Sequence, residues 1–298
     1  MVFANLSHGD LFLSTSPLIS MYGSDEKPFA KVLGIPFDST STYRMGSRFG
    51  PDSIRQAFAN IEIYSRCLNI DLEQLSFQDL GNLAETGSVD VMQDSTEKIF
   101  REIASEGLVT GILGGEHSIT YGSLKALPQD VGILIFDAHF DLREEYADLR
   151  MSHATYLRRY IEENGSNHII HVGARAATKA EWDFAEESQL KIISDNIINV
   201  DGDLSYVLKT SIQHFNRVYV SIDLDVLDPA YAPGVGNPEA SGLSTHELLE
   251  LIYLLKGKDI IGFDITELSP SHDNGSTSIV AAKCLSELLC LSYLGRND

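Results

Sequence analysis

Cysteine is scarce in this sequence of 298 residues, which has three cysteines and no spacing that suits a thiolate metal site or a redox motif. Because the count is odd, the disulfide framework of a secreted protein is not predicted either. The first twenty residues contain no Lys or Arg, and no run approaches the roughly 20 apolar residues of a membrane span. The sequence therefore predicts a cytoplasmic protein with reduced thiols and no membrane segment.

Basic residues are also in short supply, because 22 Lys and Arg stand against 43 Asp and Glu and give a formal net charge of -21. Such a surface repels nucleic acid and anionic lipid, and it concentrates cations. The charge favours a small cationic molecule as the partner. An acidic surface that serves only solubility explains the same charge, so composition alone does not identify the ligand.

Short apolar runs rich in β-branched residues alternate with stretches that suit helices. The runs cover residues 31–35, 108–113, 131–136, 168–172, 217–222 and 260–263. Continuous apolar runs are typical of strands buried on both faces, and they predict a parallel sheet covered by helices. The helical stretches are 53–66, 88–107 and 245–257, the last with Ser244 or Thr245 as its N-cap. No repeat or linker divides the chain, so residues 1–298 are predicted to form one α/β domain.

Three of these runs lead into carboxylate and imidazole side chains. They are His117 after 108–113, Asp137, His139 and Asp141 after 131–136, and Asp223 and Asp225 after 217–222. The carboxyl ends of parallel strands share one edge of the sheet, where ligands bind. In an extended segment, residues two apart point to the same side, so each group is predicted to project together. Four crowded carboxylates would repel one another, and two divalent cations would balance them.

The same six residues bear on the kind of metal. Each Asp or His alone is interpreted more simply as a satisfied polar residue at a strand end, but the set of six predicts a metal site. Carboxylates and imidazoles without a nearby Cys exclude zinc held by thiolates and favour manganese over magnesium. The ligands do not choose among manganese, iron, cobalt and nickel. A two-metal site lowers the pKa of a bridging water to roughly 7, which predicts hydrolysis.

Several segments together resemble the arginase and agmatinase family of manganese ureohydrolases. They are GGEHS at 114–118, DAHFDLR at 137–143, the stretch 221–244 and DITELSP at 264–270, while 34–55 looks like the agmatinase branch. The resemblance implies a three-layer α/β sandwich around a mainly parallel sheet of about eight strands. It also implies two Mn²⁺ ions per chain, urea as a product and a homo-oligomer, either a trimer or a hexamer.

The resemblance assigns roles to individual residues. The six residues named above match the metal ligands of the family, and Asp141 is also assigned to catalysis. Glu267 matches the carboxylate that holds the guanidinium of the substrate, and His153 resembles the acid/base histidine that passes a proton to the departing amine. For these two residues the alternatives are a surface loop residue and a structural histidine. Glu116 replaces the usual Asp of GGDHS and is expected to face away from the metal and support His117.

Three further positions each have two possible roles. Arg143 stands where arginases use small polar residues to bind the amino acid head, so it either contacts the substrate or turns away and pairs with Glu144 or Glu145. Asp228 is interpreted as a backbone organiser, with an extra metal ligand as the alternative. Glu181 either reaches a distal amine of the substrate or belongs to a solvated helix start.

The resulting functional prediction is hydrolysis of agmatine to putrescine and urea, a step of polyamine biosynthesis. Alternatives within the same class are arginase, guanidinobutyrase, aminopropylagmatine ureohydrolase and formiminoglutamase. From other classes, a catalytically silent regulator is disfavoured by the complete ligand set. A two-metal phosphatase or nuclease is disfavoured by the acidic balance.

Overall fold

A single sheet forms the centre of the computed structural model, which describes residues 12–13, 27–194 and 204–297. Within these residues its strand order is β1-β5-β2-β6-β11-β10-β7-β8-β9. Strand β1 pairs antiparallel with β5, and the other eight strands pair in parallel. The strands are β1 (Phe12–Leu13), β2 (Ala30–Gly34), β5 (Phe77–Leu83), β6 (Val109–Leu113), β7 (Gly132–Phe136), β8 (Ile169–Val172), β9 (Lys191–Ile193), β10 (Arg217–Asp223) and β11 (Asp259–Thr266). The predicted mainly parallel sheet of about eight strands is confirmed.

All six strands predicted from apolar runs are in the sheet, whereas β1, β5 and β9 were missed. The sequence of β5, FQDLGNL, is interrupted by polar residues and has two half-buried positions in its middle. Strand β9 has only three residues and ends the sheet. Strands near a margin are covered on fewer sides, so the continuous apolar run that marks a central strand is not required of them.

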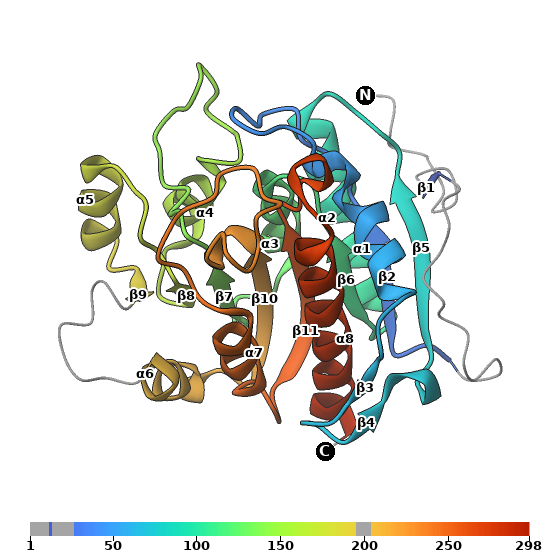
Figure 1. Ribbon diagram of the computed structural model, residues 1–298. Coiled ribbons are helices and arrows are strands. Elements are labelled where there is room, and N and C mark those ends of the chain that lie inside the picture. Colours follow the sequence, from blue (N-terminus) through green and yellow to red (C-terminus); the bar gives the residue numbers. More distant parts are fainter. Residues whose placement is uncertain (1–11, 14–26, 195–203, 298) are drawn as a thin grey trace.

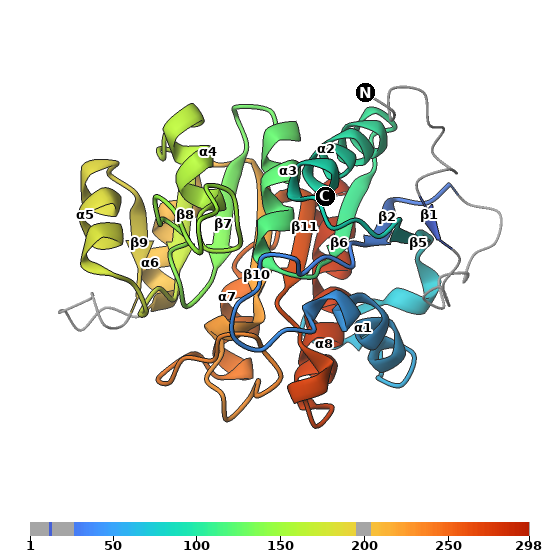
Figure 2. The same ribbon diagram turned by 90° about the horizontal axis from the view of Figure 1, so that it is seen from above.

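Helices cover both faces of the sheet and make it the middle of three layers, as Figure 2 shows from above. One face carries α1 (Gly50–Phe58), α7 (Thr245–Tyr253) and α8 (Ser276–Asn297), and the opposite face carries α2 (Val89–Ser105), α3 (Thr120–Ala126) and α4 (Tyr156–Asn164). The remaining helices are α5 (Lys179–Glu187) and α6 (Leu204–Ser211). Two separate apolar clusters, one on each side, form the core. A sheet buried on both faces explains the continuous apolar strands.

Two of the three predicted helices agree with the structure, and one was drawn too long. Helix α7 begins after Ser244, whose hydroxyl accepts a hydrogen bond from the N–H of Glu247 while the Glu247 carboxylate accepts one from the N–H of Ser244. The predicted helix 53–66 instead ends at Phe58, and Tyr64–Ser65 (β3) pairs with Ile70–Asp71 (β4) in a small hairpin. The apolar spacing beyond Phe58 belongs to that hairpin.

Helix α8 is long and apolar enough to cross a membrane by length and composition, which corrects the expectation that no segment approaches a span. In the structure, however, 72% of its apolar window is buried inside the protein. Its buried residues include Ala281, Leu285 and Leu288, which belong to the apolar cluster on that face of the sheet. The apolar composition of α8 is therefore that of a core helix.

His171 in β8 is a fully buried imidazole in the interior of the protein. Its ring packs edge-on against Phe140, with ring centroids 5.3 Å apart. Neither ring nitrogen makes a hydrogen bond of normal geometry within the described residues. Burial lowers the pKa of His171 to about 3, so the folded protein holds the ring neutral.

We predict that His171 makes the protein sensitive to acid. In the unfolded chain a histidine titrates near pH 6.5. Below this pH the unfolded state binds a proton that the buried ring of the folded state does not bind, so the free energy of unfolding falls as the pH falls. For a folded pKa of about 3, the loss between pH 7 and pH 5 is roughly 2 kcal/mol.

His171→Phe should therefore flatten the pH dependence of the free energy of unfolding, measured with urea in EDTA at the two pH values. Comparing slopes cancels any constant packing cost of the larger ring. The exposed His246→Gln is the control and should keep the slope of the wild type. An unchanged slope in His171→Phe would show that its burial does not govern acid stability.

Candidate metal centre

A cavity of about 300 Å³ opens at the carboxyl ends of the central strands. Five of the six predicted ligands line it, and the sixth, Asp137, is buried beside them. The ligands follow β6, β7 and β10 or end them, and these strands lie close together in the middle of the sheet. The structure thus brings all six residues to one place.

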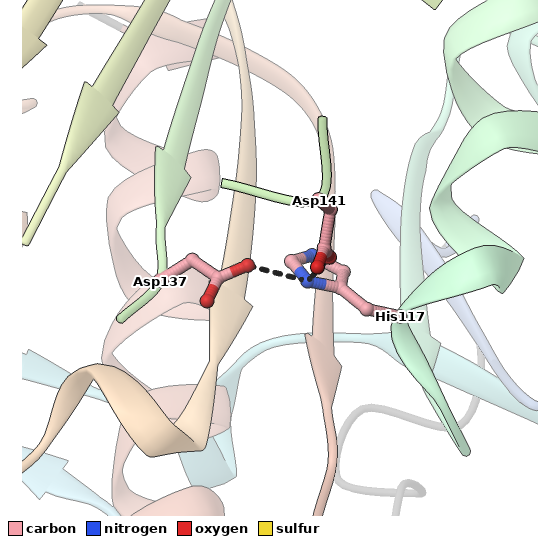
Figure 3. A group of neighbouring side chains, drawn as sticks. All are labelled: His117, Asp137 and Asp141. Atoms are coloured by element: carbon pink, nitrogen blue, oxygen red, sulfur yellow. Dashed lines mark ion pairs between the residues drawn. The ribbon is translucent and has the colours of Figure 1, made fainter. Parts of the chain in front are cut away.

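Three carboxylates surround one nitrogen of His117, and Figure 3 shows two of them, Asp137 and Asp141. The Nδ1 atom lies 2.9 Å from Asp137 Oδ2, 3.3 Å from Asp223 Oδ2 and 3.4 Å from Asp141 Oδ2. Both His117 Nδ1 and Asp137 Oδ2 are buried, and neither makes a hydrogen bond of normal geometry within the described residues. Buried polar atoms rarely lack a partner, so this arrangement fits a cation held between them.

A second group shares Asp137 with the first. The Nδ1 atom of His139 lies 2.9 Å from Asp225 Oδ2 and 3.8 Å from Asp137 Oδ1. Within each group, one ligand atom from each of the three residues lies within 4.8 Å of the others. The two oxygens of Asp137 therefore face different groups, as expected of a carboxylate that bridges two metal ions.

The predicted side-by-side projection of these residues is right, but its explanation by an extended backbone is wrong. Asp223 instead caps the 3₁₀ turn Leu224–Val226, and its carboxylate accepts a hydrogen bond of 2.8 Å from the N–H of Asp225. Asp141 adopts a φ of 54°, in the left-handed region. The backbone turns at or beside these ligands, so the alternation of faces along an extended strand does not account for their placement.

Contacts behind the site orient His117. Its Nε2 lies 2.8 Å from Ser221 Oγ, and that hydroxyl donates to Asp264 Oδ1 at 2.6 Å. Since the only proton of Ser221 goes to Asp264, Ser221 accepts from His117 Nε2–H. Nδ1 then presents a lone pair to the carboxylate group, which is the tautomer that a metal ligand needs.

The electrostatics of the cluster also fit a pair of divalent ions. Burial, followed by repulsion from Asp141 and Asp225, raises the pKa of Asp137 to about 7, and burial raises the pKa of Asp141 to about 6. Burial alone would lower the pKa of His139, but Asp225 raises it to about 11. Divalent cations would offset the burial and the mutual repulsion of these carboxylates. The mixed carboxylate and imidazole set suits manganese and other borderline ions.

Glu267 and His153 line the same cavity. Glu267 follows β11 with a φ of 64°, a left-handed conformation that costs a non-glycine residue on the order of 1 kcal/mol. Its Oε1 accepts a 2.8 Å hydrogen bond from the N–H of His117. Burial, then Asp223 and Glu116, raises the pKa of Glu267 well above its usual range. Burial lowers the pKa of His153 to about 4, so this ring is neutral near pH 7.

Arg143 lies on the cavity wall but pairs with a partner that was not predicted. Its Nε is 3.8 Å from Glu181 Oε2, and its guanidinium stands 4.7 Å from the centroid of the Tyr146 ring. The expected pairing with Glu144 or Glu145 is not what the structure shows. The side chain of Glu181 is buried and forms a capping box with Thr178, the N-cap residue of α5. The interpretation of Glu181 as part of a solvated helix start is therefore wrong for its side chain.

Two residues organise the surrounding loops, and of these Asp228 was interpreted as a backbone organiser from the sequence, whereas Arg175 was not. Asp228 accepts hydrogen bonds from the N–H groups of Ala230, Ser241 and Gly242, which makes it a turn organiser rather than a ligand. The guanidinium of Arg175 donates to backbone carbonyls, including that of Asp225 at 2.8 Å. The other acceptors of Arg175 are Gly173, Val226, Leu227, Glu239 and Ala240. Sequence analysis missed Arg175 because backbone carbonyls are the same in every residue.

Comparisons with known proteins agree with this geometry. The model of the arginase family matches residues 30–290. The chain is 39% identical over 265 residues to an agmatinase of Pyrococcus horikoshii, covering 88% of this chain and 91% of that one. It is 37% identical to the N(1)-aminopropylagmatine ureohydrolase of Thermococcus kodakarensis, over 87% and 89% of the two chains. The crystal structure of an agmatine ureohydrolase of Thermoplasma volcanium superposes with a TM-score of 0.88 at 37% identity, covering 96% and 97% of the two chains.

We predict that Asp141→Ala or Asp225→Ala reduces the bound metal below two ions per chain and removes nearly all hydrolytic activity. The fold should persist, because the sheet is held by apolar packing rather than by these carboxylates. Elemental analysis of the purified, folded variants measures the metal content. Asp228→Ala is the matched control and should keep both ions, since its carboxylate contacts only backbone N–H groups. Two ions bound to Asp225→Ala would refute the ligand assignment.

Proposed function

The chain belongs to the arginase family, and from this premise we propose that it hydrolyses agmatine to putrescine and urea at a pair of manganese ions. The observation that carries the proposal is a single cavity that combines four features. Two ligand groups joined through Asp137 stand beside Glu267 and His153. The same proposal includes a place in polyamine biosynthesis, a cytoplasmic location and a trimeric or hexameric assembly.

The bound ions supply a water of lowered pKa as the nucleophile. Glu267 orients the guanidinium, because Oε1 is occupied by His117 N–H and Oε2 remains for the N–H groups of the substrate. Gly236 leaves room there, since a Cβ at that position would lie 3.2 Å from Glu267 Oε2. Asp141 on the cavity wall orients the water. His153 passes a proton to the departing amine nitrogen, so that a neutral leaving group is expelled.

The rest of the cavity suits a cationic tail better than an amino acid head. Beyond the metal ligands, the wall carries the carboxylates of Glu181 and Glu239. The positive charge of Arg143 is already directed to Glu181 and to the Tyr146 ring. An α-carboxylate would therefore meet mostly negative charge, whereas a free amine would be attracted. This balance supports agmatine over arginine.

A longer guanidino polyamine is the second candidate substrate. A neighbouring cavity of about 410 Å³ shares Arg143, Thr178 and Glu181 with the first. Glu144 and Glu145 also line it. A tail with further amines would pass Arg143 and reach these carboxylates. This observation supports an aminopropyl-extended agmatine, and a direct comparison of the two substrates decides between them.

We predict that kcat/KM for agmatine exceeds that for arginine by at least tenfold, about 1.4 kcal/mol of transition-state discrimination. Urea release from agmatine, aminopropylagmatine, guanidinobutyrate and arginine, with Mn²⁺ restored after chelation, measures the preference. Because Arg143 is paired with Glu181, Arg143→Ala should change the agmatine-to-arginine ratio only slightly. A large shift toward agmatine in this variant would mean that the guanidinium of Arg143 receives the substrate carboxylate. Faster hydrolysis of arginine by the wild type would exclude an agmatinase.

His153→Ala should lower kcat by roughly 10² to 10⁴ while leaving KM and the bound metal nearly unchanged, because the ring moves a proton and ligates no ion. Steady-state urea release and metal analysis on the same preparation test this. The exposed His246→Ala on α7 should behave as the wild type. Loss of metal from His153→Ala would place the ring among the ligands, and unchanged turnover would make it structural.

A further inference from the structure

Glu116 is a fully buried carboxylate that contacts no predicted metal ligand side chain but is surrounded by donors. Its Oε2 accepts from the N–H of Thr40 at 2.7 Å, and its Oε1 accepts from the hydroxyls of Thr40 and Ser118, each at 2.5 Å. The hydroxyl of Ser41 lies 3.4 Å from Oε2. Both oxygens of Glu116 therefore accept hydrogen bonds, which is the pattern of a carboxylate that carries no proton.

Thr40 connects this carboxylate to His153. The N–H of His153 donates to Thr40 Oγ1 at 2.9 Å, and the ring atom Nδ1 lies 3.2 Å from the same oxygen. A threonine hydroxyl has one proton and two lone pairs. Because Glu116 takes the proton, both lone pairs face His153, one toward the backbone N–H and one toward Nδ1. Nδ1 can then hydrogen-bond to Thr40 only if it carries the proton of the ring.

We propose that Thr40 is a positioning residue that, held by Glu116, fixes His153 in the tautomer with the proton on Nδ1. The other ring nitrogen, Nε2, then presents a lone pair to the substrate in the cavity that His153 lines. This inference rests on the proposed function for the role of His153 in the reaction. The tautomer itself follows from the hydrogen bonds alone.

The tautomer determines the order of the proton transfers. Nε2 first accepts a proton from the attacking water as its oxygen bonds to the guanidinium carbon, and the imidazolium that forms keeps Nδ1–H on Thr40. Nε2 then returns this proton to the departing amine nitrogen as the carbon–nitrogen bond breaks. The ring ends neutral, and the remaining hydroxyl proton of the protonated urea passes to the released amine, so that water and guanidinium give urea and an ammonium group with atoms and charge in balance. A ring protonated on Nε2 at the start could not accept the first proton there.

The expected support of His117 by Glu116 is not what the structure shows, because the Glu116 carboxylate accepts hydrogen bonds from Thr40 and Ser118 instead. Glu116 and Thr40 are 76 positions apart in sequence, and the carboxylate bonds both the N–H and the hydroxyl of Thr40. Its neighbour His117 is oriented separately, through Ser221 and Asp264. The two histidines therefore have separate hydrogen-bonded supports, one for the metal site and one for proton transfer.

The first test reads the tautomer directly and requires no activity. In protein with ¹⁵N-labelled histidine and Mg²⁺ as a diamagnetic ion, a protonated ring nitrogen and a bare one resonate far apart, and His153→Ala identifies the signals of His153. We expect a proton on Nδ1 in the wild type and in Thr40→Ser, and a shift toward Nε2–H in Thr40→Val. A wild-type ring protonated on Nε2, or a tautomer unchanged in Thr40→Val, would overturn the proposal.

The second test is a double-mutant cycle on urea release. Thr40→Val should lower kcat roughly 10- to 100-fold with KM and metal content nearly unchanged, and Thr40→Ser should restore most of the rate. In the His153→Ala background, Thr40→Val should have little further effect, because Thr40 acts through His153. Thr96→Val, another buried threonine on α2 remote from the cavity, controls for the loss of a buried hydroxyl and should keep the wild-type kcat.

If the rate losses of Thr40→Val and His153→Ala multiplied fully in the double variant, the proposal would be overturned. The proposed function would remain intact. Failure of Thr40→Ser to restore the rate would have the same consequence. Conversely, a wild type that releases urea from no guanidino compound would refute the proposed function. In that case the tautomer of His153 would still test the inference about Thr40.

Discussion

The structure depends on one electrostatic constraint, the gathering of buried carboxylates around Asp137. Both oxygens of this residue face imidazole and carboxylate neighbours, and burial together with repulsion from Asp141 and Asp225 raises its pKa to about 7. Such a cluster is unfavourable by itself and becomes favourable when two divalent cations occupy it. The surrounding structure holds the side chains in an arrangement that suits two ions.

Different kinds of support hold this arrangement. The hydroxyl of Ser221 and the carboxylate of Asp264 fix the tautomer of His117. The guanidinium of Arg175 binds the carbonyls of the loop that carries Asp225 and Glu239. Left-handed backbone at Asp141 and Glu267 aims both carboxylates into the cavity. Strained conformations of this kind persist only where neighbouring hydrogen bonds and packing over-determine them, and here the residues concerned are those assigned to the reaction.

Charge also distinguishes the two ends of the cavity. Near the metal ligands, Glu267 is the carboxylate proposed to hold the guanidinium, and Thr40 with Glu116 is proposed to set the tautomer of His153. Toward the mouth, Arg143 is directed to Glu181 and Tyr146, so the distal wall offers little net positive charge to a carboxylate. The acidic composition of the whole chain, with a formal net charge of -21, acts in the same direction by attracting cationic substrates.

The sequence by itself determined the class of the fold and predicted the six candidate ligands that the structure brings together. Buried parallel strands require continuous apolar runs, and carboxylates in such numbers at strand ends require a cation. Only the tertiary structure decided which oxygens of Asp137 face which group, that Arg143 pairs with Glu181, and that Thr40 joins Glu116 to His153. Tight turns around Asp141 and Asp223 were also invisible, as were strand β5 and the short edge strands β1 and β9. These features depend on contacts between segments far apart in the chain, and local periodicity carries no record of such contacts.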